Sequence, residues 1–248
     1  MNDLQHLISK TFADRPDLLA AVLAANTETP EETEARERAD EARRRGEQRE
    51  MLRERRRKNS GLRGDQFTHT FAAFKFAGDA GQRASQKQTR DRCFEWAQTY
   101  PKVEHGLMLF GANGVGKDYL LHCIINRLLE RGVWDIRYWY SLDYDHALRQ
   151  EWQDQEREGL SVEQLARECD LLMIGDLHIL LAKAYQPTVR ASAMRLINAA
   201  SDEGRPVMCA TSNWAQNDFD DECLLSAGSR VAKAFEWYEL RGPDRRRM

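Results

Sequence analysis

The sequence predicts an α/β fold in which a parallel five-stranded sheet is covered by helices on both faces. Beyond residue 66, short apolar runs of strand length alternate with longer segments of helical periodicity, which is typical of consecutive β-α-β units. The short runs are apolar almost throughout, as expected of strands that are buried on both faces. We expect strands at 106–110, 135–142, 171–175, 206–212 and 235–240, and helices near 83–100, 116–131, 143–155 and 187–203.

A strongly charged segment, 29–58, precedes this pattern. Thr29 is a candidate N-cap, Pro30 suits the first helical position and Glu32 completes a capping box, so a helix is expected to begin here. The segment has no apolar stripe. It is therefore expected to be a solvated helix or linker, and a basic arm that contacts nucleic acid or an acidic partner is the alternative.

The first residues of the chain carry two groups of apolar side chains at helical spacing, separated by "DRP". This pattern predicts two short amphipathic helices that are too small to form a core of their own. We therefore expect a helical partner-binding region at 1–58, a linker at 59–66 and the main domain at 67–248. The apolar positions are Leu4, Leu7, Ile8, Phe12, Leu18, Leu19, Val22 and Leu23.

Composition excludes several classes of protein. The 248-residue chain has a net charge of only −3, so no global basic field indicates a nucleic-acid partner. Its five cysteines are widely spaced and form no C-x-x-C pair, which indicates reduced core thiols and not disulfides or a zinc site. No unbroken apolar stretch approaches the roughly 18 residues that a membrane span needs. We expect a cytoplasmic protein with no signal peptide and no membrane partner.

The segment "GANGVGK" matches the phosphate-binding pattern G-x-x-x-x-G-K, and it lies directly after an apolar strand and before a helix. In this context the glycines let backbone amides converge on phosphate oxygens, and the helix N-terminus adds partial positive charge. Lys117 is expected to reach the β and γ phosphates. The residues expected to contact a nucleotide are Gly111, Ala112, Asn113, Gly114, Val115, Gly116, Lys117, Asp118 and Tyr119.

Two positions differ from the usual magnesium site of such proteins. Asp118 follows the lysine where a serine or threonine hydroxyl normally holds the ion, and Gly175 ends an apolar strand where a metal-binding aspartate belongs. Asp176 then takes the place of the acid that orients the attacking water. The next apolar strand is followed by Asn213, whose amide is expected beside the γ phosphate.

The chain has thus lost one magnesium carboxylate at Gly175 and gained one at Asp118. Without a metal, a γ phosphate would repel Asp118 by about 4 kcal/mol, for unit charges at roughly 4 Å and an effective dielectric of about 20. Magnesium between them makes the interaction favourable, because this hard cation prefers carboxylate oxygen. We hypothesise that the ligand has moved to the loop, with Asp118 and Asp176 as metal-binding residues. A site that no longer functions is the alternative.

Taken together, these motifs resemble the DnaC-type helicase loaders and the related IstB-type transposition ATPases of the AAA+ class. The resemblance covers roughly two thirds of the chain, through "TFAAFKF", "GLMLFGANGVGKDYLL", "DLLMIGDL", "PVMCATSNW" and "GSRVAKAF". It implies an AAA+ P-loop NTPase fold with ATP and Mg²⁺ as cofactors. Gly175 and Asp176 match the Walker B pair, Asn213 matches sensor 1, and Arg230 matches a catalytic arginine that approaches the nucleotide. Ala234 stands where relatives usually carry the arginine finger of a neighbouring subunit.

The resemblance also implies a function. It is that of an ATP-binding replication accessory factor, with weak or slow ATP hydrolysis, that loads a hexameric replicative helicase of the DnaB type onto single-stranded DNA. Self-association through the AAA+ domains is expected on the helicase, and the divergence fits a phage or prophage origin. The alternatives are an IstB-like transposition helper that binds duplex DNA, and a non-hydrolysing AAA+ scaffold.

Two further features are candidates for DNA contact. Trp139, Tyr140, Tyr144 and Trp152 could stack on single-stranded bases, although a strand such as "RYWY" more often buries its rings, and we expect core packing. The basic tail "RGPDRRRM" could contact phosphates or be a soluble end.

Overall fold

The computed structural model describes residues 30–133, 135–154, 159–222 and 227–247. The chain divides into two compact units, Met1–Leu52 and Arg53–Met248. Thr29 and the amphipathic helices expected near the start of the chain lie outside the described residues. The division into regions 1–58, 59–66 and 67–248 stays a prediction.

The charged segment forms one helix, α3 (Pro30–Asn59). Ion pairs between residues four apart support it, as in Arg38–Glu34 (2.9 Å) and Arg45–Glu41 (2.6 Å). Each such exposed pair contributes a few tenths of a kcal/mol. The described side chains of α3 are almost all exposed, so the helix is solvated, as its lack of an apolar stripe predicted.

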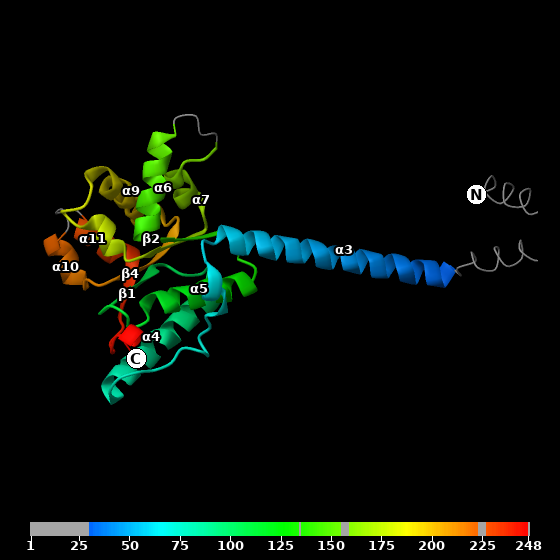
Figure 1. Ribbon diagram of the computed structural model, residues 1–248, viewed down its shortest axis with the longest axis horizontal. Helices are drawn as coiled ribbons and strands as arrows, with labels where there is room; N and C mark the ends of the chain where they lie inside the picture. Colours follow the sequence, from blue (N-terminus) through cyan, green and yellow to red (C-terminus); the bar gives the residue numbers. More distant parts are fainter. Residues whose placement is uncertain (1–29, 134, 155–158, 223–226, 248) are drawn as a thin grey trace, which may run out of the picture. The chain divides into compact units, whose positions relative to one another are not determined.

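The second unit contains a five-stranded parallel sheet with the strand order β2-β3-β4-β1-β5 (Figure 1). All five predicted strands are present, with bounds within two residues of those expected. The register aligns Phe110 with Ser212, which brings the carboxyl ends of β1 and β4 to the same edge of the sheet. The strands are β1 (Gly106–Phe110), β2 (Ile136–Tyr140), β3 (Leu171–Gly175), β4 (Val207–Ser212) and β5 (Phe235–Glu239).

Strand residues alternate between two apolar cores, one on each face of the sheet. Leu107 and Leu109 of β1 join the core beneath α4 (Ala80–Thr99) and α5 (Lys117–Glu130), whereas Met108 joins the opposite core. The helices therefore lie on both sides of the sheet, as Figure 1 shows. The opposite face is covered by α6 (Ser141–Gln153), α7 (Val162–Glu168) and α9 (Pro187–Glu203).

The sequence did not predict several short elements. These have at most eight residues, so too few turns exist for an apolar period to be recognised. Besides α7, they are α8 (Leu177–Leu181), α10 (Gln216–Glu222), α11 (Ala227–Ala234) and the 3-10 turns η1 (Gly64–Thr68) and η2 (Arg245–Arg247).

Part of the predicted linker packs against the sheet. The backbone N–H of Tyr138 in β2 donates to the carbonyl of Ser60 (2.9 Å), and Leu62 is buried in the core beneath α4 and α5. Gly61 has a φ of 82°, and a Cβ there would lie 2.1 Å from the Tyr138 carbonyl oxygen. The chain is therefore held along β2 at a position that only glycine fits.

The described cysteines are buried free thiols, in agreement with their expected place in the core. In the part of the chain that the structure describes, the helices are too short or too polar to cross a membrane. The thiols are Cys93, Cys123, Cys169 and Cys209.

Candidate nucleotide-binding site

The loop 111–116 leaves the sheet at the end of β1 and leads directly into α5. Gly114 (φ 75°) and Gly116 (φ 106°) adopt left-handed backbone conformations, and Val115 between them is fully buried and anchors the turn. The first N–H groups of α5 have no acceptor within the helix. They therefore remain available to phosphate oxygens at the carboxyl edge of the sheet.

Lys117 is buried and its side chain folds back over this loop. Its ammonium donates to the carbonyl oxygens of Gly111 (3.0 Å) and Ala112 (2.9 Å) and to Oδ1 of Asn213 (2.8 Å). Burial lowers the pKa of Lys117, whereas the negative charges of Asp118 and, to a lesser extent, Asp176 act to raise it. The lysine and the predicted sensor residue Asn213 are thus in direct contact.

Asn213 also contacts His178, at the start of α8. Its backbone N–H lies 3.3 Å from Nδ1 of the imidazole, and its Nδ2 atom lies 3.2 Å from Nε2. Burial lowers the pKa of His178, so the ring is neutral near pH 7 and can accept a hydrogen bond. Sequence reasoning missed this contact, because the two residues follow different strands and only the sheet order brings them together.

Asp176 begins α8 with a φ of 53°, and it is the only described non-glycine residue with a positive φ. Its backbone N–H donates to Oγ1 of Thr211 (2.8 Å), and the hydroxyl of Tyr140 donates to its carboxylate. A left-handed non-glycine residue costs on the order of 1 kcal/mol, and such strain concentrates at functional sites. The contacts hold the Asp176 carboxylate at the end of β3.

Asp118 lies half-buried in the first turn of α5. Its Oδ1 accepts a hydrogen bond from Oγ1 of Thr211 (2.8 Å), the same hydroxyl that receives the Asp176 N–H. Burial raises the pKa of Asp118, the Thr211 hydrogen bond opposes this, and the charge of Asp176 adds to the rise. Thr211 therefore connects the two acids predicted to bind metal.

The C-terminal segment 240–247 runs beside the loop. The N–H of Leu240 donates to the Phe110 carbonyl (2.8 Å), and the N–H of Arg245 donates to the Gly114 carbonyl (3.0 Å). The sequence suggested a basic tail here that contacts phosphates or is a soluble end. The structure attaches this tail to the loop that is expected to bind phosphate.

An aromatic cluster adjoins the same loop. The guanidinium of Arg245 lies 4.2 Å from the ring centroid of Phe74 and donates to Oε1 of Gln86 (2.9 Å). Tyr119 packs near Phe74, at 5.7 Å between ring centroids, and stacks on His69 at 4.1 Å. Phe74 is buried, whereas Tyr119 and His69 are half-buried, so the cluster packs the C-terminal segment and the start of α5 together beside the loop.

The predicted arginine Arg230 is half-buried on α11. Among the described residues, no hydrogen bond or ion pair joins it to the lysine, the acids or the asparagine of the site. Ala234, at the end of the same helix, is buried in the core on the α9 side of the sheet. A side chain as long as arginine would have to leave that core to reach a neighbouring subunit.

The four aromatic residues considered for DNA contact have different environments. Tyr144 is fully buried and Trp139 packs against the same core, as expected. Tyr140 is half-buried and bound to Asp176. The expectation of core packing is wrong for Trp152, which is 48% exposed near the end of α6, because the buried residues of this helix end at Leu148, about one turn earlier.

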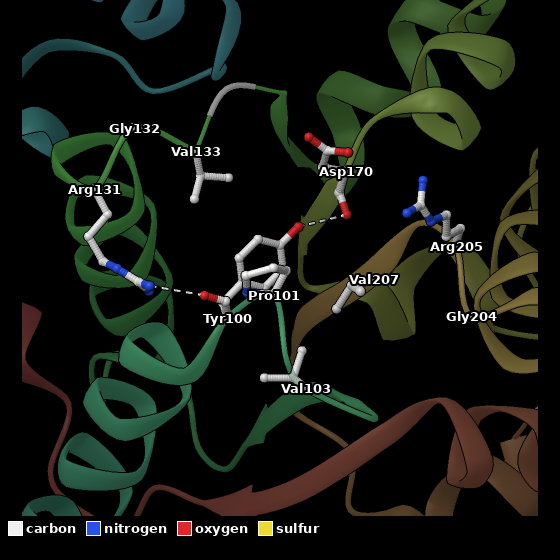
Figure 2. Close-up of a pocket in the computed structure, with 10 residues that line it drawn as sticks. All are labelled: Tyr100, Pro101, Val103, Arg131, Gly132, Val133, Asp170, Gly204, Arg205 and Val207. Carbon is white, nitrogen blue, oxygen red and sulfur yellow. Dashed lines mark hydrogen bonds between the residues drawn. The ribbon is translucent and has the colours of Figure 1, made fainter.

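A separate cavity of about 540 Å³ lies at the opposite edge of the sheet (Figure 2). Val103, Asp170 and Val207 lie at or just before the starts of their strands. Tyr100 projects into it and donates to the Asp170 carbonyl (3.1 Å), while Arg131 donates to the Tyr100 carbonyl (3.0 Å). Ligands of open α/β sheets bind at the carboxyl ends of strands, so this cavity is not the nucleotide site.

The sheet order, the loop after β1 and the polar residues at the ends of β3 and β4 define a P-loop NTPase of the AAA+ class. Residues 66–224 match the family model described as the bacterial DnaA ATPase domain. This match covers more than half of the chain, and the chain belongs to that family. No curated protein sequence matches it.

Solved structures share the fold at low sequence identity. The DnaC helicase loader is 14% identical, with a TM-score of 0.59, and the match covers 72% of this chain and all (100%) of that one. A putative primosome component from Streptococcus pyogenes is 19% identical, with a TM-score of 0.57 and coverage of 74% and 92%. The replication initiator DnaA bound to AMPPCP and single-stranded DNA is 16% identical, with a TM-score of 0.56; the match covers 71% of this chain but only 50% of that DnaA chain.

Proposed function

We propose that this protein is an ATP-binding replication accessory factor that binds a hexameric replicative helicase of the DnaB type and loads it onto single-stranded DNA. ATP acts mainly as a ligand that changes conformation, and its hydrolysis is weak or slow. Membership of the DnaA ATPase-domain family supports nucleotide binding. The fold shared with the DnaC helicase loader supports the loading role.

The observation that carries this proposal is the position of Lys117. Its ammonium is held at the carboxyl edge of the sheet by Gly111, Ala112 and Asn213, directly beside the first turn of α5. Phosphate oxygens bound to the amides of that turn would lie within reach of the ammonium, which would then exchange neutral oxygen partners for a charged one. Asn213 is released by the same exchange and becomes available to orient a water molecule.

The described acids fit a magnesium ion at this site. Asp118 and Asp176 provide carboxylate oxygens of the kind that Mg²⁺ prefers. Thr211 binds both residues, the first through its carboxylate and the second through its backbone N–H. When bound, the ion neutralises negative charge on the phosphates. Asp176, held by Tyr140, is the residue proposed to orient the attacking water.

Two features support slow turnover. Gly175 has no side chain to offer at the usual metal-binding position, and Ala234 offers no arginine to a neighbouring subunit. An arginine finger is worth roughly 10³- to 10⁵-fold in rate in other NTPases. Self-association on the helicase would then serve assembly more than catalysis.

The partner-binding role is assigned to residues 1–58. Their predicted apolar faces need a partner, and the helicase is the partner proposed for them.

Contact with single-stranded DNA is proposed separately, because the DnaA structure that shares the fold was solved with single-stranded DNA. The exposed Trp152 is a candidate for stacking on a base, which is worth about 1–3 kcal/mol per ring in other proteins.

Nucleotide binding is tested by titrating ATP into the wild type and Lys117→Ala. The variant is expected to bind at least about tenfold more weakly, a loss of about 1.4 kcal/mol or more. Lys102→Ala is the matched control, because Lys102 is exposed and lies before β1, at the other edge of the sheet. Equal affinity of wild type and Lys117→Ala would contradict the loop assignment.

Helicase binding is tested by co-purification with candidate hexameric helicases. A variant that lacks residues 1–52 is suitable, because it removes the first compact unit and keeps Ser60 and Leu62, which pack within the second. It is expected to bind ATP normally and to lose the helicase. Retention of the helicase at wild-type strength would assign these residues another role.

A further inference from the structure

The end of β3 lies against the first turn of α5. A Cβ atom built on Gly175 would lie 3.3 Å from Oδ1 of Asp118, 3.1 Å from the hydroxyl of Tyr138 and 3.0 Å from Cδ2 of Tyr140. The Asp118 carboxylate therefore borders the space into which a side chain at position 175 would project. A carboxylate is present at this place in the fold, although it comes from the first turn of α5 and not from the strand.

The Asp118 carboxylate has one oxygen occupied and one available. Oδ1 accepts the Thr211 hydrogen bond, and no other described residue donates a hydrogen bond to this carboxylate. Thr211 also binds the backbone of Asp176 (2.8 Å), which fixes the side chain of Asp118 relative to the end of β3. The hydrogen bond from Thr211 to Oδ1 thus holds the carboxylate in place and leaves the other oxygen, Oδ2, available to a ligand.

The charges around this carboxylate are unbalanced. The neighbouring Asp176 is also acidic. Lys117 and, to a lesser extent, Arg246 act on Asp118 as cations, but the Lys117 ammonium is bound to Gly111, Ala112 and Asn213 and not to this carboxylate. Two half-buried carboxylates beside the triphosphate position repel each other when both are charged, and a cation between them relieves that repulsion. A divalent ion with oxygen ligands satisfies both the geometry and the charge.

We propose that Asp118 supplies to the magnesium of the bound nucleotide the carboxylate ligand that Gly175 lacks. This inference rests on the proposed nucleotide binding. It implies that the site holds one carboxylate, which can come from position 118 or from position 175 but not from both. An aspartate at 175 in the presence of Asp118 would be crowded and repelled, whereas the same aspartate beside a threonine at 118 would restore the charge.

The experiment measures the affinity for ATP by calorimetry in magnesium and in a chelator, for the full-length chain. The variants are Asp118→Asn, Asp118→Thr, Gly175→Asp and the double variant Asp118→Thr/Gly175→Asp. Asp202→Asn is the matched control, because the contacts of this exposed acid on α9 are at the surface: an ion pair with Lys233 (3.5 Å) and a hydrogen bond from the neighbouring Ser201 (3.1 Å). Circular dichroism and thermal melts establish that each variant is folded. Electron paramagnetic resonance of Mn²⁺ in the presence of ATP gives a second readout, because it detects the bound ion directly.

In the wild type and in the Asp202→Asn control, the chelator is expected to weaken ATP binding at least about tenfold. Asp118→Asn and Asp118→Thr should reduce this magnesium dependence to less than about threefold. The resonance signal of protein-bound Mn²⁺ should be lost in both variants. Asp118→Asn is the more stringent of the two, because its amide oxygen keeps the Thr211 hydrogen bond. The double variant should regain the magnesium dependence, while Gly175→Asp alone should bind ATP more weakly than wild type.

Tighter ATP binding by Asp118→Thr, both with magnesium and with chelator, would overturn the inference, because it would show that Asp118 only repels phosphate. Unchanged magnesium dependence in Asp118→Asn would overturn it as well. Neither result would affect the proposed function if Lys117→Ala still weakens ATP binding at least about tenfold. If wild-type protein binds no ATP in either condition, the proposed function fails and this inference with it.

Discussion

The Nζ atom of Lys117 lies 2.8 Å from Oδ1 of Asn213, so the cation expected to bind phosphate is held by the residue expected to position water. Neither Lys117 nor Asn213 can perform its expected role while the two are bound to each other. Nucleotide binding is therefore expected to break this bond, and the asparagine competes with phosphate for the lysine. The relationship has a direct consequence for variants of Asn213.

Asn213→Ala is expected to lower the rate of ATP hydrolysis by about 10²-fold, as the loss of a positioned polar group does in other enzymes. Its affinity for ATP should stay the same or increase up to about threefold, because Lys117 loses one competing acceptor. Single-turnover hydrolysis and calorimetry separate the two effects. Asn217→Ala, at an exposed position in α10, is the control. Loss of ATP affinity in Asn213→Ala would contradict the competition between amide and phosphate.

Asp118→Asn is expected to stabilise the nucleotide-free protein at pH 7. Burial, with a contribution from Asp176, raises the pKa of Asp118 in the folded state above its ordinary value. An acid with a raised folded pKa destabilises the protein when it is charged, and this penalty is absent below the unfolded pKa and complete above the folded pKa. The gain in melting temperature should therefore be larger at pH 7 than at pH 4. An equal gain at both pH values would indicate a packing effect instead.

His122 is expected to make the protein less stable in mild acid. Its ring is buried, its Nδ1 lies 3.0 Å from Nδ1 of His69, and its Nε2 has no hydrogen-bond partner within the described chain. Burial, with a contribution from His69, lowers the pKa of His122 to about 4, against a weaker opposing effect of Asp65. The Tyr138 ring of β2 packs against it in a T-shaped arrangement, at 5.1 Å between ring centroids.

A histidine with a lowered folded pKa costs stability as the pH falls from its unfolded value of about 6.5 to its folded value of about 4. The full effect is up to about 3 kcal/mol, at 1.36 kcal/mol per pKa unit. Denaturant unfolding between pH 7 and pH 4 measures it. His122→Gln should flatten the slope, whereas His105→Gln, at an exposed position, should leave it unchanged. An unaltered slope in His122→Gln would exclude this histidine as the cause.

Gly114→Ala is expected to detach the C-terminal segment from the loop. A Cβ at this position would lie 1.8 Å from Oδ1 of Asp244, and the φ of 75° disfavours alanine by about 1 kcal/mol or more. Stability and ATP affinity should both fall, and proteolysis of the segment 241–247 should become faster. Gly46→Ala is the matched control, because no atom lies within 4 Å of its Cβ and α3 is helical there, so it should be neutral or slightly stabilising. Equal behaviour of the two variants would contradict the close contact at Gly114.

Much of the fold could be predicted because its signals are local. The strands are five or six residues long and rich in apolar or aromatic side chains, and the long helices that pack on the sheet have an apolar period that continues over several turns. The short helices α8, α10 and α11 lacked that length, so they were missed. The exposure of Trp152 was also misjudged, because the identity of a residue does not reveal where the buried face of its helix ends.

The candidate site divides in the same way. The loop 111–117 was recognised from adjacent residues, and its place between β1 and α5 follows from chain order. The roles of Tyr140, His178 and Arg245 could not be predicted, because each contacts the site through an element remote in the sequence. A tyrosine at a strand end, or an arginine in a basic tail, carries no local signal of such a contact.

The sequence by itself determined the parallel sheet, the phosphate-binding loop and the loss of a carboxylate at Gly175, since these depend on residue type and on neighbours along the chain. Only the tertiary structure decided that Asp118 reaches Thr211, 93 positions away, and that Lys117 reaches Asn213, 96 positions away. The physical reason is that these contacts depend on strand order. With β4 between β3 and β1, the carboxyl ends of all three meet at one edge, and hydrogen bonds can form there between segments that share no local pattern.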